Sequence, residues 1–121
     1  MGDLFHPDRD QLDLTAVMHA LSDPARRKVV ATLAVEGERA CGTFDLGVTK
    51  ATASHHFKVL REAGVTMTRI DGAHRFLTLR RDDLDARFPG LLDAVLAAEP
   101  APAGTASIAR APPGAARGWS R

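Results

Sequence analysis

The sequence of 121 residues predicts a mainly α-helical domain that contains one two-stranded β-hairpin. Two observations lead to this fold class. Apolar residues recur at the spacing of an α-helix through most of residues 12–63 and again in residues 82–98. Between these stretches, in residues 65–80, apolar and polar residues alternate, and Asp71-Gly72 interrupts the alternation near its middle. Alternation interrupted by Asp-Gly is typical of a β-hairpin.

Composition limits the chain to one small folded domain with tails, because 45 % of the residues are hydrophobic and 26 % are charged. We expect a flexible arm in residues 1–11, the folded domain in residues 12–98 and a disordered Pro/Ala/Gly/Arg-rich tail in residues 99–121. No apolar run approaches the roughly 20 residues of a membrane span, and Cys41 has no second cysteine for an intramolecular disulfide. The expected location is the cytoplasm.

The first half of the domain is expected to hold three helices. Residues 12–21 form the first, with an apolar stripe of Leu14, Val17, Met18 and Leu21. Ser22-Asp23-Pro24 is typical of a helix start, because a capping side chain precedes a proline in the first turn, and the second helix follows in residues 25–35. We expect a short third helix in residues 40–46 and a tight turn at Gly47-Val48.

The most informative stretch is Val48 to Gly64, which predicts one helix over residues 49–63. Thr49 can cap its first turn, and Gly64 supplies the positive φ that ends a helix. One face is apolar, and the other carries hydroxyl and cationic side chains: Lys50, Thr52, Ser54, His55, Lys58 and Arg61. Such donors suit the phosphates and base edges of a DNA major groove, so we expect a helix-turn-helix. A solvated helix with a basic bias is the alternative.

The expected hairpin is basic as well. It carries Arg69, His74, Arg75, Arg80 and Arg81 against the single carboxylate of Asp71. A type I′ turn is expected at Asp71-Gly72, because both residues tolerate positive φ. A helix-turn-helix followed by such a hairpin is a winged helix, whose wing contacts the phosphate backbone or the minor groove. The positive charge of the chain is accordingly concentrated in residues 24–81, whereas residues 1–23 and 82–99 are net negative.

A closing helix is expected in residues 82–98. Its first turn contains Asp82, Asp83 and Asp85, which favour the positive end of the helix dipole. Pro89-Gly90 interrupts it, so a kink or two short helices is expected.

Two segments carry a resemblance to a known family. ALSDPARRKVVATL, followed by SHHFKVLREAG and a basic wing, resembles the ArsR/SmtB family of bacterial winged-helix transcriptional regulators over roughly residues 12–96. The resemblance implies a homodimer that binds operator DNA, usually as a repressor, and that often responds to a metal or another inducer. Carried over by position, the major groove would be probed by Lys50, Thr52, Ser54 and His55, the phosphates bound by Lys58 and Arg61, and the wing tip formed by His74 and Arg75.

The metal ligands that the family implies are missing here by residue type. Ala40-Cys41-Gly42-Thr43 lacks the Cys-x-Cys pair, and Ala94 and Ala97 take the later ligand positions of the last helix. A divalent transition-metal ion is still considered as an effector, but neither of the family's metal sites can be assigned in this sequence. The remaining candidate ligands are His6, which lies beside Asp8 and Asp10, and Cys41. The alternatives are a solvated histidine and a partly buried small hydrophobe.

The sequence thus predicts a DNA-binding transcriptional regulator, most simply an operator-binding repressor that reads an inverted repeat. No spacing of catalytic residues indicates an enzyme. Two alternatives stay open: a winged-helix module that binds a protein partner, and a regulator controlled by a partner protein and not by a metal.

Overall fold

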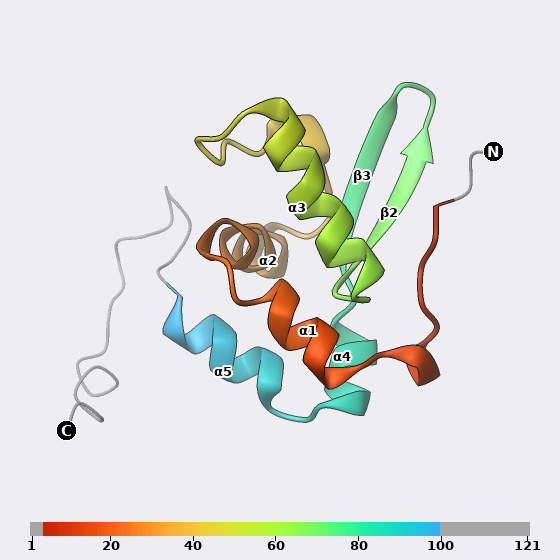
Figure 1. The fold of residues 1–121 in the computed structure, drawn as a ribbon, viewed down its shortest axis with the longest axis vertical. Helices are drawn as coiled ribbons and strands as arrows, with labels where there is room; N and C mark the ends of the chain where they lie inside the picture. The colour runs from red at the N-terminus through yellow and green to blue at the C-terminus, as the bar shows by residue number, and fades with distance from the viewer. Residues whose placement is uncertain (1–3, 100–121) are drawn as a thin grey trace.

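The computed structural model describes residues 4–99 as five α-helices and a three-stranded antiparallel sheet (Figure 1). The helices are α1 (Leu14–Ala20), α2 (Pro24–Glu36), α3 (Lys50–Glu62), α4 (Arg81–Arg87) and α5 (Leu91–Ala98). The strands are β1 (Arg39–Ala40), β2 (Thr66–Asp71) and β3 (His74–Leu79). This is the predicted winged helix, with the hairpin β2–β3 as the wing. Of the predicted tail, residues 100–121 lie outside the described residues.

Helices α1 and α2 start at the residues that local chemistry favours. The Asp13 carboxylate accepts a hydrogen bond from the Ala16 amide at the start of α1. The Asp23 carboxylate accepts from the amides of Ala25 and Arg26 ahead of Pro24, as the sequence predicts. Gly37, with φ +82°, follows the last residue of α2.

The short helix expected in residues 40–46 is not formed. Arg39 and Ala40 instead pair with Leu77 and Phe76 of β3, and a single 3₁₀ turn, η2 (Cys41–Thr43), follows. Pairing with a strand from later in the chain takes backbone groups that a helix would need. The expectation was therefore wrong here, although Gly47 adopts the positive φ of a tight turn before α3.

Helix α3 has both predicted boundaries. The Thr49 hydroxyl accepts a hydrogen bond from the Thr52 amide at 3.1 Å, and Gly64 adopts φ +86° beyond the last turn. A Cβ atom on Gly64 would lie 2.0 Å from Cδ2 of Leu12, so this position is restricted both by its backbone and by its neighbour. The end of α3 thereby lies close against the segment that leads into α1.

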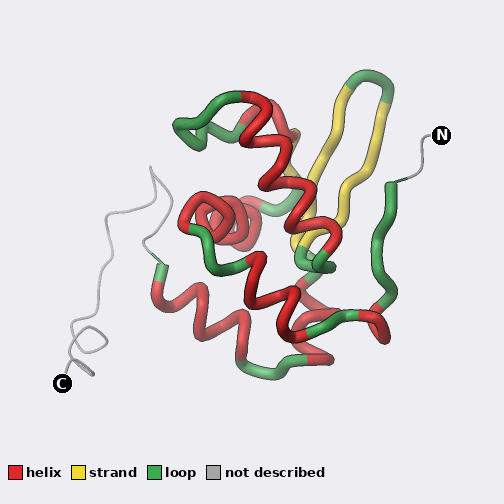
Figure 2. Tube along the Cα trace, in the orientation of Figure 1, coloured by secondary structure: helices red, strands yellow, loops and turns green. Residues whose placement is uncertain are grey.

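The wing is the predicted hairpin with its turn shifted by one residue. Asp71 pairs with His74, so Gly72 and Ala73 form the turn, and Gly72 has φ +62°. The sheet order β1-β3-β2 makes β2 an edge strand. Figure 2 shows the hairpin beside α3 and projecting beyond the helices.

Every helix contributes to one hydrophobic core, which fixes α3 and the wing against the rest of the domain. Its buried members include Val17, Ala20, Val29, Val30, Leu33, Leu60, Leu77, Leu84 and Leu92. The closing helix is divided at Pro89-Gly90 into α4 and α5, as predicted. Within residues 4–99 no helix is long and apolar enough to cross a membrane.

The N-terminal segment makes contacts that its composition does not predict. Residues 4–8 run in extended form beside the wing (Figures 1 and 2). The Thr68 amide of β2 donates to Nε2 of His6 at 3.0 Å, and the Arg80 guanidinium donates to the Pro7 carbonyl at 2.7 Å. The described part of the expected flexible arm is thus bonded to the edge strand and to the start of α4.

Candidate nucleic-acid interface

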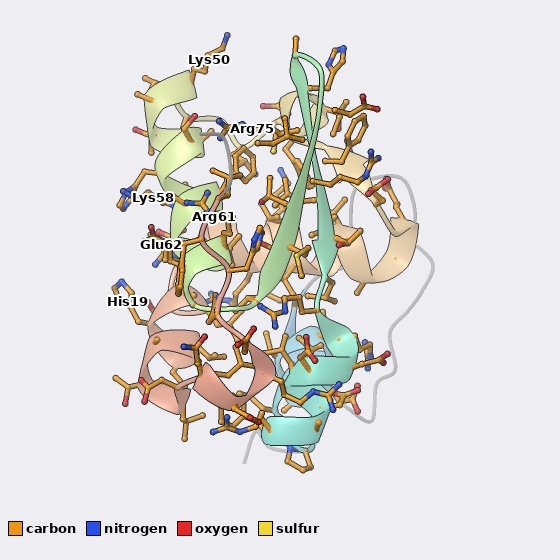
Figure 3. The ribbon with its side chains drawn as sticks, turned by 90° about the vertical axis from the view of Figure 1, so that its right-hand side faces the viewer. His19, Lys50, Lys58, Arg61, Glu62 and Arg75 are labelled. Carbon is orange, nitrogen blue, oxygen red and sulfur yellow. The ribbon has the colours of Figure 1, made fainter. Side chains whose placement is uncertain are left out.

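The outer face of α3 presents the side chains that the sequence places there. Lys50, Thr52, Ser54, His55 and Lys58 are all exposed. On the opposite side of the helix, His56 and Leu60 are buried in the domain. Figure 3 shows Lys50 projecting from the first turn of α3 and Lys58 pointing away from the hairpin. The helix is therefore amphipathic with a donor-rich surface.

A groove of about 960 Å³ lies between η2, α3 and the wing. It brings together six of the nine side chains predicted to bind DNA, namely Lys50, Ser54, Lys58, Arg61, His74 and Arg75. Arg75 lies between α3 and the hairpin in Figure 3. Thr52, His55 and Arg69 are not among the groove's residues.

The cations along this groove differ in how they are balanced. Among the described residues, Lys50, Lys58 and Arg75 form no ion pair with a carboxylate. Asp45 lines the groove as well, and its carboxylate accepts from the Gly47 amide. The result is a surface with three unpaired cations on two neighbouring elements, which is the distribution that attracts a phosphate backbone.

Arg61 does not lie on the outer face, in contrast to the sequence prediction. Its residue exposure is 9 %, Nε donates to the Phe5 carbonyl at 3.2 Å, and Nη2 lies 3.7 Å from the Glu62 carboxylate. The physical reason is that residues 4–8 cover the last turn of α3 and provide an acceptor there. No local pattern signals this partner, because it lies 56 positions away.

Arg69 is engaged on the wing itself. Its guanidinium donates twice to the Glu38 carboxylate, at 3.0 and 3.2 Å, and lies 4.6 Å from the centre of the Phe76 ring. The hydrogen bonds with Glu38 raise the pKa of Arg69, and those with Arg69 lower the pKa of Glu38. The sequence analysis missed Glu38, which precedes β1 and whose carboxylate meets the Arg69 side chain across β3.

His6 is held as a hydrogen-bond acceptor at the base of the wing. Partial burial lowers its pKa, and the nearby cations Arg61 and Arg80 lower the pKa further, while a hydrogen bond with the Leu4 backbone opposes them. Accepting from the Thr68 amide requires an unprotonated Nε2. This arrangement favours the neutral imidazole.

Cys41 lies half-buried in the wall of the groove. Burial raises the pKa of its thiol, and the charge of Arg75 opposes that shift. Within residues 4–99 no three His, Cys, Asp or Glu side chains gather closely enough to hold a metal ion. The described residues therefore assign no metal site to either His6 or Cys41.

The chain is similar in sequence to a helix-turn-helix domain and to transcriptional regulators. A family model described as a helix-turn-helix domain matches residues 21–69. The chain is 42 % identical over 80 residues to YceK of Bacillus subtilis, an uncharacterized HTH-type transcriptional regulator, covering 64 % of this chain and 80 % of YceK. It is 35 % identical over 66 residues to a cadmium resistance transcriptional regulatory protein, a CadC homolog of Staphylococcus aureus, covering 53 % of this chain and 54 % of that protein.

Two solved structures share the fold. The transcriptional repressor BigR of Xylella fastidiosa superposes with a TM-score of 0.52 at 32 % identity, covering 68 % of this chain and 81 % of BigR. An ArsR-family transcriptional regulator superposes with a TM-score of 0.54 at 23 % identity, covering 69 % of this chain and 84 % of the other.

Proposed function

Because the chain belongs to the ArsR/SmtB family of winged-helix transcriptional regulators and is a DNA-binding regulator, we propose that it is a homodimeric repressor of an inverted-repeat operator. In this proposal α3 reads the sequence and the wing binds the neighbouring backbone. The half-sites would lie about one helical turn apart.

The observation that carries the proposal is the row of exposed donors on α3 beside a basic wing. Lys50, Thr52, Ser54 and His55 are exposed in the first half of α3, where a recognition helix contacts base edges. Lys58 follows one turn later and suits a phosphate. His74 and Arg75 are exposed at the start of β3, and we assign them to the backbone contact of the wing.

Arg61 and Arg69 take a different part in this proposal. Both were predicted from the sequence to contact DNA, yet Arg61 is bonded to the Phe5 carbonyl and Arg69 to Glu38. A guanidinium already bonded to the protein gains less from a phosphate than a hydrated one, because it must first give up its partner. We therefore assign them to holding the N-terminal segment and the wing in place.

The homodimer is proposed from two apolar surfaces that residues 4–99 leave exposed or only partly buried. On α1, Leu14 and Met18 are 46 % and 54 % exposed. On α5, Leu91, Val95 and Leu96 are only partly buried against the core. Pairing these surfaces between two copies would remove apolar area from water and place two α3 helices on one duplex.

The function is tested by fluorescence anisotropy with labelled duplexes at two salt concentrations. The DNA upstream of the protein's own gene is compared with a scrambled duplex of equal composition. We expect tighter binding to the upstream DNA and weaker binding to both duplexes at high salt, because phosphate contacts release counterions. No salt-dependent binding to either duplex would contradict the proposal and favour the alternative of a module that binds a protein partner.

Regulation is tested in the same titration. The Staphylococcus aureus relative is named for cadmium resistance, so Cd²⁺ is a reasonable first ion to add. Ni²⁺, Zn²⁺, Co²⁺ and arsenite are added in parallel titrations. Release of the DNA by one ion would support a metal-responsive repressor. Binding unchanged by all of them would favour control by a partner protein or an organic ligand.

A further inference from the structure

A buried pair of side chains, Arg26 of α2 and His56 of α3, connects the recognition helix to the rest of the domain. Arg26 is 6 % and His56 is 8 % exposed. Nη1 of Arg26 lies 3.1 Å from Nδ1 of His56. The same guanidinium donates through Nε to the Ala20 carbonyl at 2.7 Å and through Nη2 to the His19 carbonyl at 3.1 Å. One side chain thus joins α1, α2 and α3.

The chemistry of the pair fixes its protonation pattern. A guanidinium has donors and no acceptor, so Nδ1 of His56 accepts the hydrogen bond and carries no proton. The carbonyls of His19 and Ala20 belong to the last turn of α1, where the helix dipole is negative and favours a cation. Asp23 adds a coulombic attraction to the Arg26 guanidinium. The buried charge of Arg26 is therefore balanced without a direct carboxylate partner.

This contact differs in kind from the other contacts of α3. The helix packs on the core through Leu60 and the partly buried Phe57 and Val59, and apolar packing has little directional preference. A hydrogen bond between two buried, planar groups is directional. Within the described residues, one further side-chain hydrogen bond joins α3 to another element, from Arg61 in its last turn to the Phe5 carbonyl. The Arg26–His56 bond lies near the middle of the helix.

Because His56 lies on α3, the Arg26–His56 hydrogen bond determines which side chains of the helix point outward. Successive residues of an α-helix point about 100° apart, so holding His56 inward directs the preceding Ser54 and His55 outward. A small rotation of α3 about its axis would move every base-contacting side chain together. Such a rotation would leave the overall positive charge of the surface unchanged.

We propose that Arg26 and His56 are positioning residues that set the rotation of α3 and thereby its sequence discrimination. This inference rests on the proposed function, in which α3 reads base edges. Neither side chain contacts DNA in this view. Their loss should reduce discrimination between sequences while leaving electrostatic affinity for any duplex nearly unchanged.

The experiment compares variants that keep or remove the acceptor. A duplex is first selected from a random pool with the wild-type protein, and the ratio of its affinity to that of a scrambled duplex is measured. His56→Leu removes the acceptor at similar volume, His56→Asn returns a carbonyl oxygen near the place of Nδ1, and Arg26→Met removes the donors. Thr32→Val is the matched control, since it removes a buried hydroxyl that bonds within α2 to the Lys28 carbonyl.

We expect His56→Leu and Arg26→Met to lower the affinity ratio about tenfold, the change that corresponds to one interaction of ordinary strength. The double variant should lose no more than either single variant, because both remove the same contact. His56→Asn and Thr32→Val should retain the wild-type ratio. Binding to the scrambled duplex should change less than about twofold in all of them. Circular dichroism and thermal melts confirm that each variant is folded at the assay temperature.

Three results would overturn the inference: a wild-type ratio in His56→Leu, an equal loss in His56→Asn, or additive losses in the double variant. If His56→Leu does not fold, Arg26→Lys takes its place, because it retains the charge without the guanidinium fork and should lower the ratio likewise. Failure of the wild-type protein to enrich any sequence would instead contradict the proposed function itself.

Discussion

Lys58 and Arg61 lie one turn apart on α3 and have different surroundings. Lys58 is exposed without a carboxylate partner among the described residues, whereas Arg61 is buried beneath the N-terminal segment. Residue type alone predicts the same role for both, because each is a cation on a helix with a basic face. Their contacts predict different responses to substitution.

We expect Lys58→Ala to weaken binding to all duplexes and to reduce the slope of log K against log salt by about one. Arg61→Ala should leave that slope unchanged and instead lower the free energy of unfolding by about 1–3 kcal/mol, because the Phe5 carbonyl loses its donor. Anisotropy titrations at several salt concentrations and urea unfolding measure the two effects. A flattened salt dependence in Arg61→Ala would place its guanidinium on a phosphate after all.

His6 predicts a pH dependence of stability. Its pKa in the folded protein lies below the ordinary value of 6.5, so the unfolded chain binds more protons as the pH falls through that region. The stabilisation is therefore fully present above pH 6.5 and is lost on acidification below it. In His6→Gln the side-chain oxygen can accept from the Thr68 amide at any pH. The free energy of unfolding, measured with urea, should therefore differ less between pH 5.5 and pH 7.5 than it does in the wild type. An equal difference would contradict the role of His6.

At the scale of elements, two helices end at glycines with positive φ, and the two glycines differ in how much space surrounds them. Gly37 follows α2 with φ +82°, and no atom lies within 4 Å of the place of a Cβ. Gly64 follows α3 with φ +86°, and a Cβ there would lie 2.0 Å from the Leu12 side chain. Any other residue would be strained at both positions. At Gly64 the missing Cβ also allows the end of α3 to pack closely against the N-terminal part of the chain.

We expect Gly37→Ala to lower the free energy of unfolding by about 1–3 kcal/mol from backbone strain alone, because φ +82° with ψ −147° is a conformation that residues with a Cβ rarely adopt. Gly64→Ala should add about 1–3 kcal/mol of overpacking to the cost of backbone strain, because Leu12 must move. Thermal and urea unfolding of the two variants provide the comparison. Equal losses would mean that the segment around Leu12 yields without resistance.

At the scale of the whole molecule, the apolar surfaces that α1 and α5 present within residues 4–99 predict the assembly. Met18 is 54 % exposed and lies on the same helix as Leu14, while Val35 on α2 is an apolar residue of similar exposure, 59 %. We expect Met18→Glu to convert a dimer into monomers and to weaken operator binding by at least about tenfold, because two half-sites are no longer bound together. Val35→Glu is the matched control and should remain dimeric. Sedimentation velocity measures both, and a monomeric wild type would contradict the proposal.

Much of the fold could be predicted because its signals are local. The Asp23-Pro24 start of α2, the Thr49 cap and Gly64 end of α3, and the division at Pro89-Gly90 each act within a few residues. The helix expected in residues 40–46 could not be excluded in this way. Its replacement by β1 depends on pairing with β3, more than thirty residues later.

The candidate site likewise has features that local sequence predicts and features that only tertiary contacts set. The sequence by itself determined the donor-rich face of α3, the basic wing and the order of the elements, since periodicity and side-chain type are properties of neighbouring residues. The tertiary structure decided which cations are unpaired and which are bonded: Arg61 to the Phe5 carbonyl, Arg69 to Glu38 and Arg26 to His56. These partners are 30 or more positions apart, so they meet through packing of the core, which no local pattern specifies.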